Sequence, residues 1–191
     1  MKARSATELL DHLETRTEEN LSLARTLAQL PTEQLRKRPA ADRWNALECL
    51  EHLNRLNGPY HARIFAALEA AGDKPAVATF TSTWIGNKLA SSMKPVQGTR
   101  PVPTTKKMNP RGAVLDRSIL DRFLADERQL RNFIERAREV DLNRVKIRSP
   151  LAWIIRLRLG DALRLLTYHD WRHLEQACRA VGVPVPQSAG R

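Results

Sequence analysis

Cysteine and glycine are scarce in this chain of 191 residues, which contains two Cys and eight Gly. Two cysteines are too few for a disulfide framework, so a packed core must hold the fold together. Cys49 and Cys178 each lie inside an expected helix and are interpreted as buried free thiols. Because long stretches also run without proline or glycine, the sequence predicts an all-α fold.

Several kinds of segment are also missing. No run of about 18 or more apolar residues is present, so no segment is expected to span a membrane and no membrane partner is expected. The N-terminus lacks a basic stretch followed by an apolar one, which predicts a cytoplasmic protein. No Gly-rich phosphate loop, Cys-x-x-Cys pair or Gly-x-Ser-x-Gly motif occurs. The length fits one domain covering residues 1–191.

Acidic residues are outnumbered by basic ones, 21 to 32, and the net charge is +11. Such a balance raises the question of nucleic-acid binding. The basic residues are dispersed, however, and those in helices alternate with acids, as on a solvated surface. The one local cluster, which has no aromatic side chain to stack a base, consists of Arg100, Lys106, Lys107 and Arg111. We therefore expect no specific nucleic-acid partner.

Helical periodicity predicts four long helices joined by shorter segments. The first begins at a Ser5 cap and ends before Pro31. The second covers 44–71 after an Asp42 cap, the third covers 112–140, and the fourth covers 159–181 with Gly182 as its stop. Shorter helical turns are expected at 31–35, at 83–92 and at 151–155, where the last closes one end of the bundle.

The connection between the second and third long helices is unusually long. Residues 72–111 contain five prolines, and a connection of this length is usually functional or mobile. Phe80 and Trp84 are expected to hold it against the core. The tail at 184–191 is expected to be irregular.

Two histidines, His169 and His173, lie four residues apart in the fourth helix. They are about 40° apart around the helix axis, on its apolar face. Buried imidazoles need hydrogen-bond partners, and a divalent metal satisfies two at once. The alternative is a pair of ordinary core histidines. His61 is nine residues after His52, on the opposite side of the second helix, so these two cannot serve one site.

Two segments carry a resemblance to a known family. Residues 44–53 place a tryptophan eight residues before His52, and residues 169–176 read His-x-x-x-His-x-x-Gln. In this order and spacing the chain resembles the DinB/YfiT-like family of metalloenzymes over nearly its whole length. The resemblance implies a four-helix bundle in up-down-down-up order, with residues 72–111 as a long crossover between the second and third helices. It also implies that His52, His169 and His173 bind a divalent metal, zinc or nickel.

The implied chemistry is that of an open metal site. Three imidazoles leave one coordination position for water or for a low-molecular-weight thiol, so a hydrolase or a thiol transferase acting on a small-molecule substrate is expected. Metal affinity is expected to fall as the pH drops through about 6.5. The alternatives are a non-catalytic metal-binding protein and a basic interaction protein, and a homodimer is a further expectation.

Three polar residues near the histidines are candidates for catalysis or for orienting the ligands. Glu48 or Glu51 can act as a base or can orient a ligand, the alternative being an exposed helix residue. Gln176 lies on the His173 face and can orient that ligand, the alternative being an amide at the edge of the core.

Overall fold

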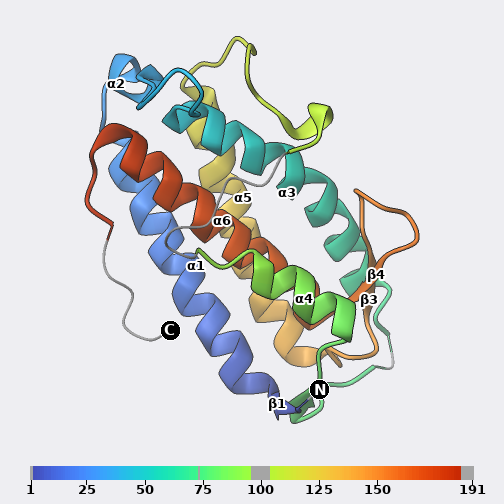
Figure 1. The fold of residues 1–191 in the computed structure, drawn as a ribbon. Helices are drawn as coiled ribbons and strands as arrows, with labels where there is room; N and C mark the ends of the chain where they lie inside the picture. The colour runs from blue at the N-terminus through green and yellow to red at the C-terminus, as the bar shows by residue number, and fades with distance from the viewer. Residues whose placement is uncertain (1, 73, 96–103, 186–191) are drawn as a thin grey trace.

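Four long helices pack side by side and form the body of the molecule (Figure 1). The computed structural model describes residues 2–72, 74–95 and 104–185. The long helices are α1 (Ala6–Ala28), α3 (Ala46–Glu69), α5 (Ser118–Arg136) and α6 (Leu159–Val181). Both α1 and α3 pack against α5 and against α6. The expected all-α class is therefore confirmed.

Short elements connect the long helices. The helical ones are α2 (Thr32–Arg36), α4 (Trp84–Ser92), η1 (Lys106–Met108) and η2 (Ala137–Glu139). Two antiparallel pairs of short strands, which the sequence did not predict, join β1 (Arg4–Ser5) to β2 (Thr79–Phe80) and β3 (Lys146–Arg148) to β4 (Arg156–Arg158). Among the described residues, no helix is long and apolar enough to cross a bilayer.

The ends of α1 and α6 agree with the sequence, whereas the cap of α3 differs from it. Ser5 Oγ accepts a hydrogen bond from the Glu8 amide at 3.2 Å, and Gly182 ends α6 with a φ of 75°. The prediction of Asp42 as the α3 cap is wrong, because Asn45 caps this helix. Its Oδ1 accepts from the Glu48 amide at 2.9 Å, while Glu48 Oε2 accepts from the Asn45 amide at 3.0 Å. This reciprocal pair satisfies two amide groups that the helix itself leaves free.

The third long helix begins later than predicted. It starts at Ser118 rather than at 112, and Asp116 Oδ1 accepts from the Ser118 amide at 2.8 Å. Gly112 has a φ of 82°, which is not helical, and Val114 is fully exposed. The helix also ends earlier, at Arg136, and the chain continues as the 3₁₀ turn η2. Val114 therefore lies in the connection before the helix and not on its buried face.

The predicted helical turn at 151–155 is wrong. These residues belong to the loop that connects β3 to β4, where the Ser149 amide donates to the Ile155 carbonyl at 2.8 Å. Instead of closing the bundle, this loop projects from it (Figure 1). The flanking residues show the two-residue alternation of a strand, with Ile147 and Leu157 buried between basic side chains that are exposed or, for Arg158, half-buried.

The connection at 72–111 is only partly fixed by the residues expected to hold it. The short helix predicted at 83–92 is confirmed as α4, and Thr83 Oγ1 caps it by accepting from the Gly86 amide at 2.9 Å. Phe80 is fully buried, as predicted. Trp84 is 69% exposed, so the expectation that it packs on the core is wrong. Arg100, part of the basic cluster, and residues 186–191 of the tail lie outside the described residues.

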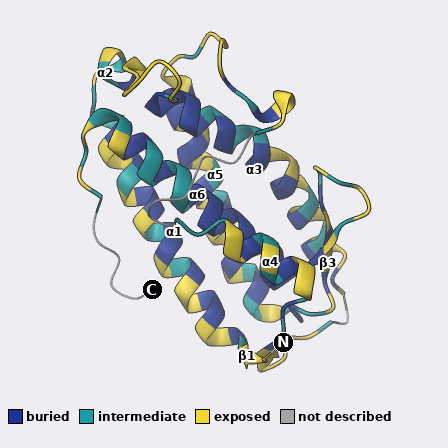
Figure 2. Ribbon diagram, viewed as in Figure 1, coloured by how far each residue is buried: buried dark blue, intermediate teal, exposed yellow. Residues whose placement is uncertain are grey.

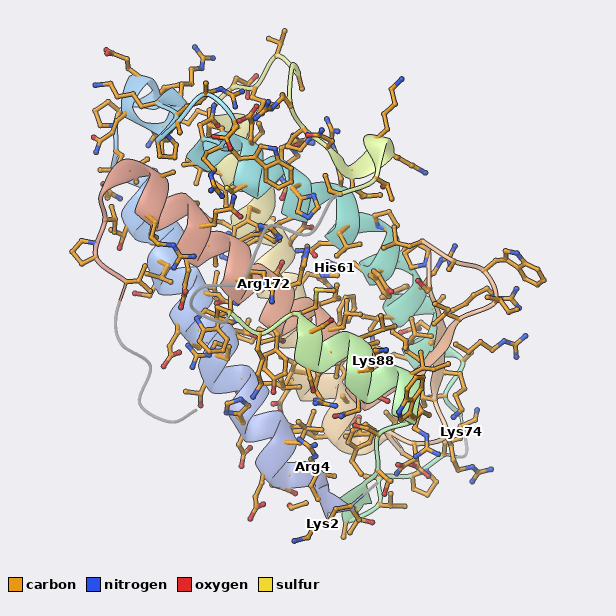
Figure 3. The ribbon with its side chains drawn as sticks, viewed as in Figure 1. Lys2, Arg4, His61, Lys74, Lys88 and Arg172 are labelled. Atoms are coloured by element: carbon orange, nitrogen blue, oxygen red, sulfur yellow. The ribbon has the colours of Figure 1, made fainter. Side chains whose placement is uncertain are left out.

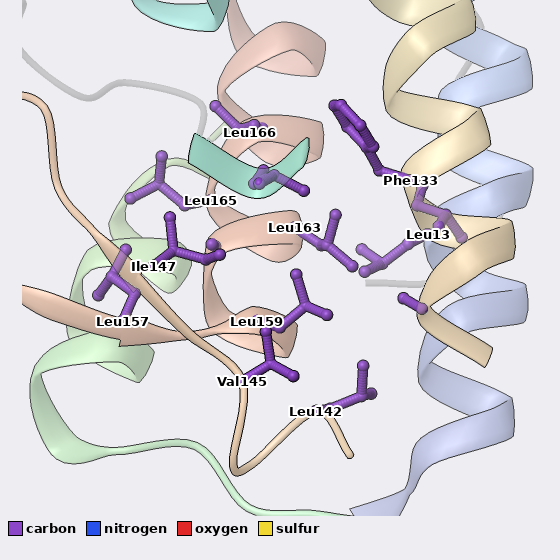
Figure 4. Packing of buried hydrophobic residues seen from close by; sticks show 14 of the residues in the cluster. Leu13, Phe133, Leu142, Val145, Ile147, Leu157, Leu159, Leu163, Leu165 and Leu166 are labelled. Atoms are coloured by element: carbon purple, nitrogen blue, oxygen red, sulfur yellow. The ribbon is translucent and has the colours of Figure 1, made fainter. Parts of the chain in front are cut away.

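Buried side chains follow the inward faces of the long helices (Figure 2). They form two apolar clusters. The larger one joins α1, α5 and α6 to the β3–β4 hairpin, and Figure 4 shows Leu13, Phe133, Ile147, Leu157 and Leu163 within it. The smaller one includes Leu47, Leu50 and Leu53 of α3, which flank the segment that carries His52.

Candidate metal centre

Three imidazoles converge between α3 and α6. His52 comes from α3, and His169 and His173 come from successive turns of α6. One ring nitrogen from each lies within 4.8 Å of the other two, and the Nε2 atoms of His52 and His169 are 3.3 Å apart. The cluster unites the three histidines that the sequence singled out.

The orientation of the His52 ring is set by a backbone carbonyl. His52 Nδ1 lies 2.8 Å from the carbonyl oxygen of Met108, which is in η1. Because a carbonyl oxygen only accepts, Nδ1 must carry the proton. The lone pair of His52 is therefore on Nε2, the atom that faces His169. Met108 was not identified from the sequence, because only the folded crossover brings it near α3.

The orientation of the His173 ring is set by Gln176. His173 Nδ1 lies 2.9 Å from Gln176 Oε1, one turn further along α6. With the amide oxygen in this position, Nδ1–H donates and the Nε2 lone pair remains free. Gln176 therefore orients the His173 ring, and its role in orienting a metal ligand stays a prediction.

Trp44 covers one side of the cluster. Its ring centroid is 4.9 Å from that of His52 and 6.0 Å from that of His173. An indole at this distance keeps bulk water away from both imidazoles. Trp44 therefore packs against the cluster.

Burial keeps all three imidazoles in their neutral form. Desolvation lowers the pKa of His173 to about 3 and also lowers the pKa of His52. The pKa of His169 is lowered well below its usual range, first by burial and then by the neighbouring histidines. Neutral imidazoles with free lone pairs are the form in which histidine binds metals.

The donor set fits a tetrahedral divalent ion. With metal–nitrogen bonds of about 2.0–2.1 Å and tetrahedral angles, two ligand nitrogens are about 3.3 Å apart. The Nε2 atoms of His52 and His169 have this separation. Because Nδ1 of His52 carries its proton, its Nε2 can bind a metal while the hydrogen bond to the Met108 carbonyl is kept. The 3.3 Å contact between the two Nε2 atoms would be replaced by their bonds to the ion. Three protein ligands leave a fourth position for a small molecule.

Glu48 and Glu51 lie near His52 in α3, and both already have partners. Glu48 is buried, with Oε1 2.5 Å from Arg38 and Oε2 bound to the Asn45 amide. Glu51 is half-buried and forms ion pairs with Arg55 and Arg122. The alternative of an exposed helix residue is therefore wrong for Glu48, while catalysis by either carboxylate stays a prediction.

A pair of buried carboxyl groups, Glu127 of α5 and Asp170 of α6, was not found from the sequence. Both are fully buried, and Asp170 Oδ1 accepts from Asn57 Nδ2 at 3.0 Å. Burial raises the pKa of Asp170 to about 7, and burial together with Asp170 raises the pKa of Glu127. The burial of Glu127 could have been predicted from its position, because it falls between Phe123 and Leu130, at helical spacing within the apolar face of α5.

His61, which is labelled in Figure 3, comes from α3 but is not one of the three converging histidines. Its Nδ1 is 3.7 Å from Asp126 Oδ1, and its ring meets Phe133 edge-on at 5.3 Å between centroids. Burial lowers its pKa to about 4. The expectation that His52 and His61 cannot serve one site agrees with this placement.

Comparison with known proteins gives one match. A family model described as the DinB superfamily matches residues 12–177, a range that includes all three converging histidines. No curated protein and no solved structure matches this chain.

Proposed function

Since this chain belongs to the DinB superfamily, we propose that it is a divalent-metal enzyme whose ion is held by His52, His169 and His173. The observation that carries the proposal is the convergence of three neutral imidazoles, of which His52 and His169 are buried and His173 is half-buried. Two of them have their protons held on Nδ1 by other groups. Zinc and nickel are the ions proposed, because both suit imidazole ligands. We further propose that the long helices follow the up-down-down-up order of the family.

The ion would supply a Lewis acid with an open position, at which water or a thiol loses its proton near neutral pH. The protein supports this chemistry by fixing its ligands. The Met108 carbonyl and Gln176 hold the rings of His52 and His173, and Trp44 limits access by water. Such orienting contacts are typically worth about 10–100-fold in metal affinity.

The crossover offers positive charge near the cluster. Lys106 and Lys107 precede Met108 in η1, and both are exposed. Arg55 of α3 donates to the Lys107 and Asn109 carbonyls and so holds this turn beside His52. These cations would attract the carboxylates of low-molecular-weight thiols. The proposed reaction is hydrolysis or transfer of such a thiol, and the alternatives are a non-catalytic metal-binding protein and a basic interaction protein.

Cobalt substitution distinguishes these functions. We expect the cobalt-loaded protein to develop a sulfur-to-cobalt charge-transfer band when a low-molecular-weight thiol is titrated, and the band should be absent in His169→Ala. His61→Ala, with an equally buried histidine outside the cluster, should keep it. Turnover of a simple ester or amide without a thiol band would favour hydrolysis. If cobalt binds but neither a thiol band nor turnover of an ester or amide is observed, an enzymatic role for the substrates tried would be contradicted.

The structure also changes the expected pH dependence of metal binding. Protons compete with the metal only when the pH approaches the pKa of the ligands in the free protein. Burial lowers all three of these values, to about 3 for His173, so protons compete with the metal at a lower pH than they would at free imidazoles. We therefore expect zinc affinity to stay nearly constant from about pH 8 to pH 6. A chelator competition titration, corrected for protonation of the chelator, measures this, and a steep loss beginning near pH 6.5 would contradict it.

A further inference from the structure

The β3–β4 hairpin presents an apolar tip to solvent. Its loop projects from the bundle (Figure 1) and carries Leu151, Trp153 and Ile154, which are 57%, 75% and 76% exposed. The base of the hairpin is fixed, because Ile147 and Leu157 are buried in the larger apolar cluster. A rigid support therefore holds three large apolar side chains away from the rest of the molecule.

The outer face of the same hairpin is entirely basic. Lys146 lies directly opposite Arg158, and Arg148 lies directly opposite Arg156. Like charges placed directly opposite each other destabilise an antiparallel pair. Within the described part of the chain, Lys146, Arg148 and Arg156 form no ion pair with an acidic residue. A partner that brings negative charge would relieve this repulsion.

We propose that the hairpin docks on a bilayer containing anionic lipids, with Leu151, Trp153 and Ile154 inserted at the interface and the arginines against lipid phosphates. Tryptophan favours the boundary between headgroups and acyl chains, and basic residues near the surface are attracted by anionic lipid. Arg148 and Arg156 lie within three residues of the apolar tip, or about 10 Å of extended chain. This matches the depth of about 5–10 Å to which interfacial segments enter.

The chemistry of the tip favours lipid over other occupants. A nucleic acid could stack a base on Trp153, but Leu151 and Ile154 offer no aromatic face for stacking. A second copy would bring its own basic hairpin into contact with this one, and the two would repel. The proposal departs from the sequence-based expectation of no membrane partner, which rested on the lack of a spanning segment. Surface docking requires none.

The hairpin can be altered without changing the histidine cluster. It contacts α3 near Arg63, whose Nη1 donates to the Arg148 carbonyl at 2.8 Å. His52 lies eleven residues earlier in the same helix, or about 16 Å along its axis. Metal content therefore serves as an independent check that tip variants are folded.

The test is co-sedimentation of the full chain with phosphatidylcholine vesicles, with and without phosphatidylglycerol. We expect binding only to the anionic vesicles, with a loss of at least about tenfold in affinity for Trp153→Ser/Ile154→Ser. Arg148→Gln/Arg156→Gln should weaken binding and reduce its dependence on salt. Trp84→Ser is the matched control, because Trp84 is also exposed but lies on α4. Brominated lipids should quench tryptophan emission in this control and in the parent protein, but not in the Trp153→Ser/Ile154→Ser variant.

Three results would overturn the proposal. The first is failure of the folded parent protein to bind anionic vesicles, and the second is equal binding by the parent protein and the Trp153→Ser/Ile154→Ser variant. The third is a Trp153-dependent complex with single-stranded RNA, or Trp153-dependent dimerisation in sedimentation velocity, without vesicle binding.

Discussion

Replacement of His173 by alanine is expected to yield a protein that purifies with almost no metal, whereas the parent chain carries about one ion. In the proposed site His173 supplies one of three protein ligands, and its Nε2 lone pair is freed by the contact between Nδ1 and Gln176. Altering a group that merely orients a ligand costs about 10–100-fold in affinity, so losing a ligand should cost more than about 100-fold. Elemental analysis of protein purified without a histidine tag measures the difference.

His61→Ala is the matched control for this experiment. His61 and His52 lie on the same helix and are equally exposed, at 7%. Removing either creates a similar defect in packing, but only His52 faces the other two rings. His52→Ala and His169→Ala should therefore lose metal as His173→Ala does, while His61→Ala should retain it. Equal loss from the His61 and His173 variants would mean that the three-histidine assignment is wrong.

The proximity of His169 and His173 was predictable from the sequence because helix geometry is local. A separation of four residues fixes the relative direction of His169 and His173 once the helix exists. His52 was placed by resemblance to the family, since no local pattern connects it to a helix more than a hundred residues away. The Met108 carbonyl was not predictable, because a backbone atom leaves no mark in the sequence and is positioned only by the folded crossover.

The long helices were predictable for the same reason, and the errors lie where local pattern is ambiguous. An apolar run such as 151–155 indicates burial but does not reveal whether the residues pack or project. The exposed side chains of Trp153 and Ile154 show that they project. Asp42 and Asn45 are both good capping residues, and the choice between them depends on Glu48, which completes the reciprocal pair with Asn45 only.

The buried ion pair between Asp161 and Arg164 shows a further effect that sequence cannot reveal. Asp161 is fully buried and Arg164 is 3% exposed, although both lie on the well-predicted helix α6. Asp161 Oδ1 accepts from Arg164 Nη1 at 3.1 Å, and Asp161 Oδ2 accepts from the Thr83 amide at 3.1 Å. Arg164 also donates to Ser82 Oγ and to Asn87 Oδ1. The pair therefore fastens the start of α4 to α6.

Close packing around Asp161 prevents its surroundings from rearranging when Arg164 is removed. A Cβ atom on Gly86 would lie 2.1 Å from Asp161 Oδ2, so the backbone of α4 approaches the carboxylate as closely as a glycine permits. If Arg164 is lost, the carboxylate remains buried with a single amide donor and cannot easily move toward water. An unpaired buried charge is among the most destabilising defects in a folded protein.

Arg164→Met is therefore expected to lower the free energy of unfolding by about 3–5 kcal/mol in urea denaturation. Arg179→Met is the control, because Arg179 forms an ion pair with Glu175 on the exposed side of the same helix and should cost less than about 1 kcal/mol. The double variant Asp161→Asn/Arg164→Met should lose less than the sum of its single variants, since removing both charges leaves neither unpaired. Equal, small losses for Arg164→Met and Arg179→Met would show that the buried pair does not fasten α4 to α6.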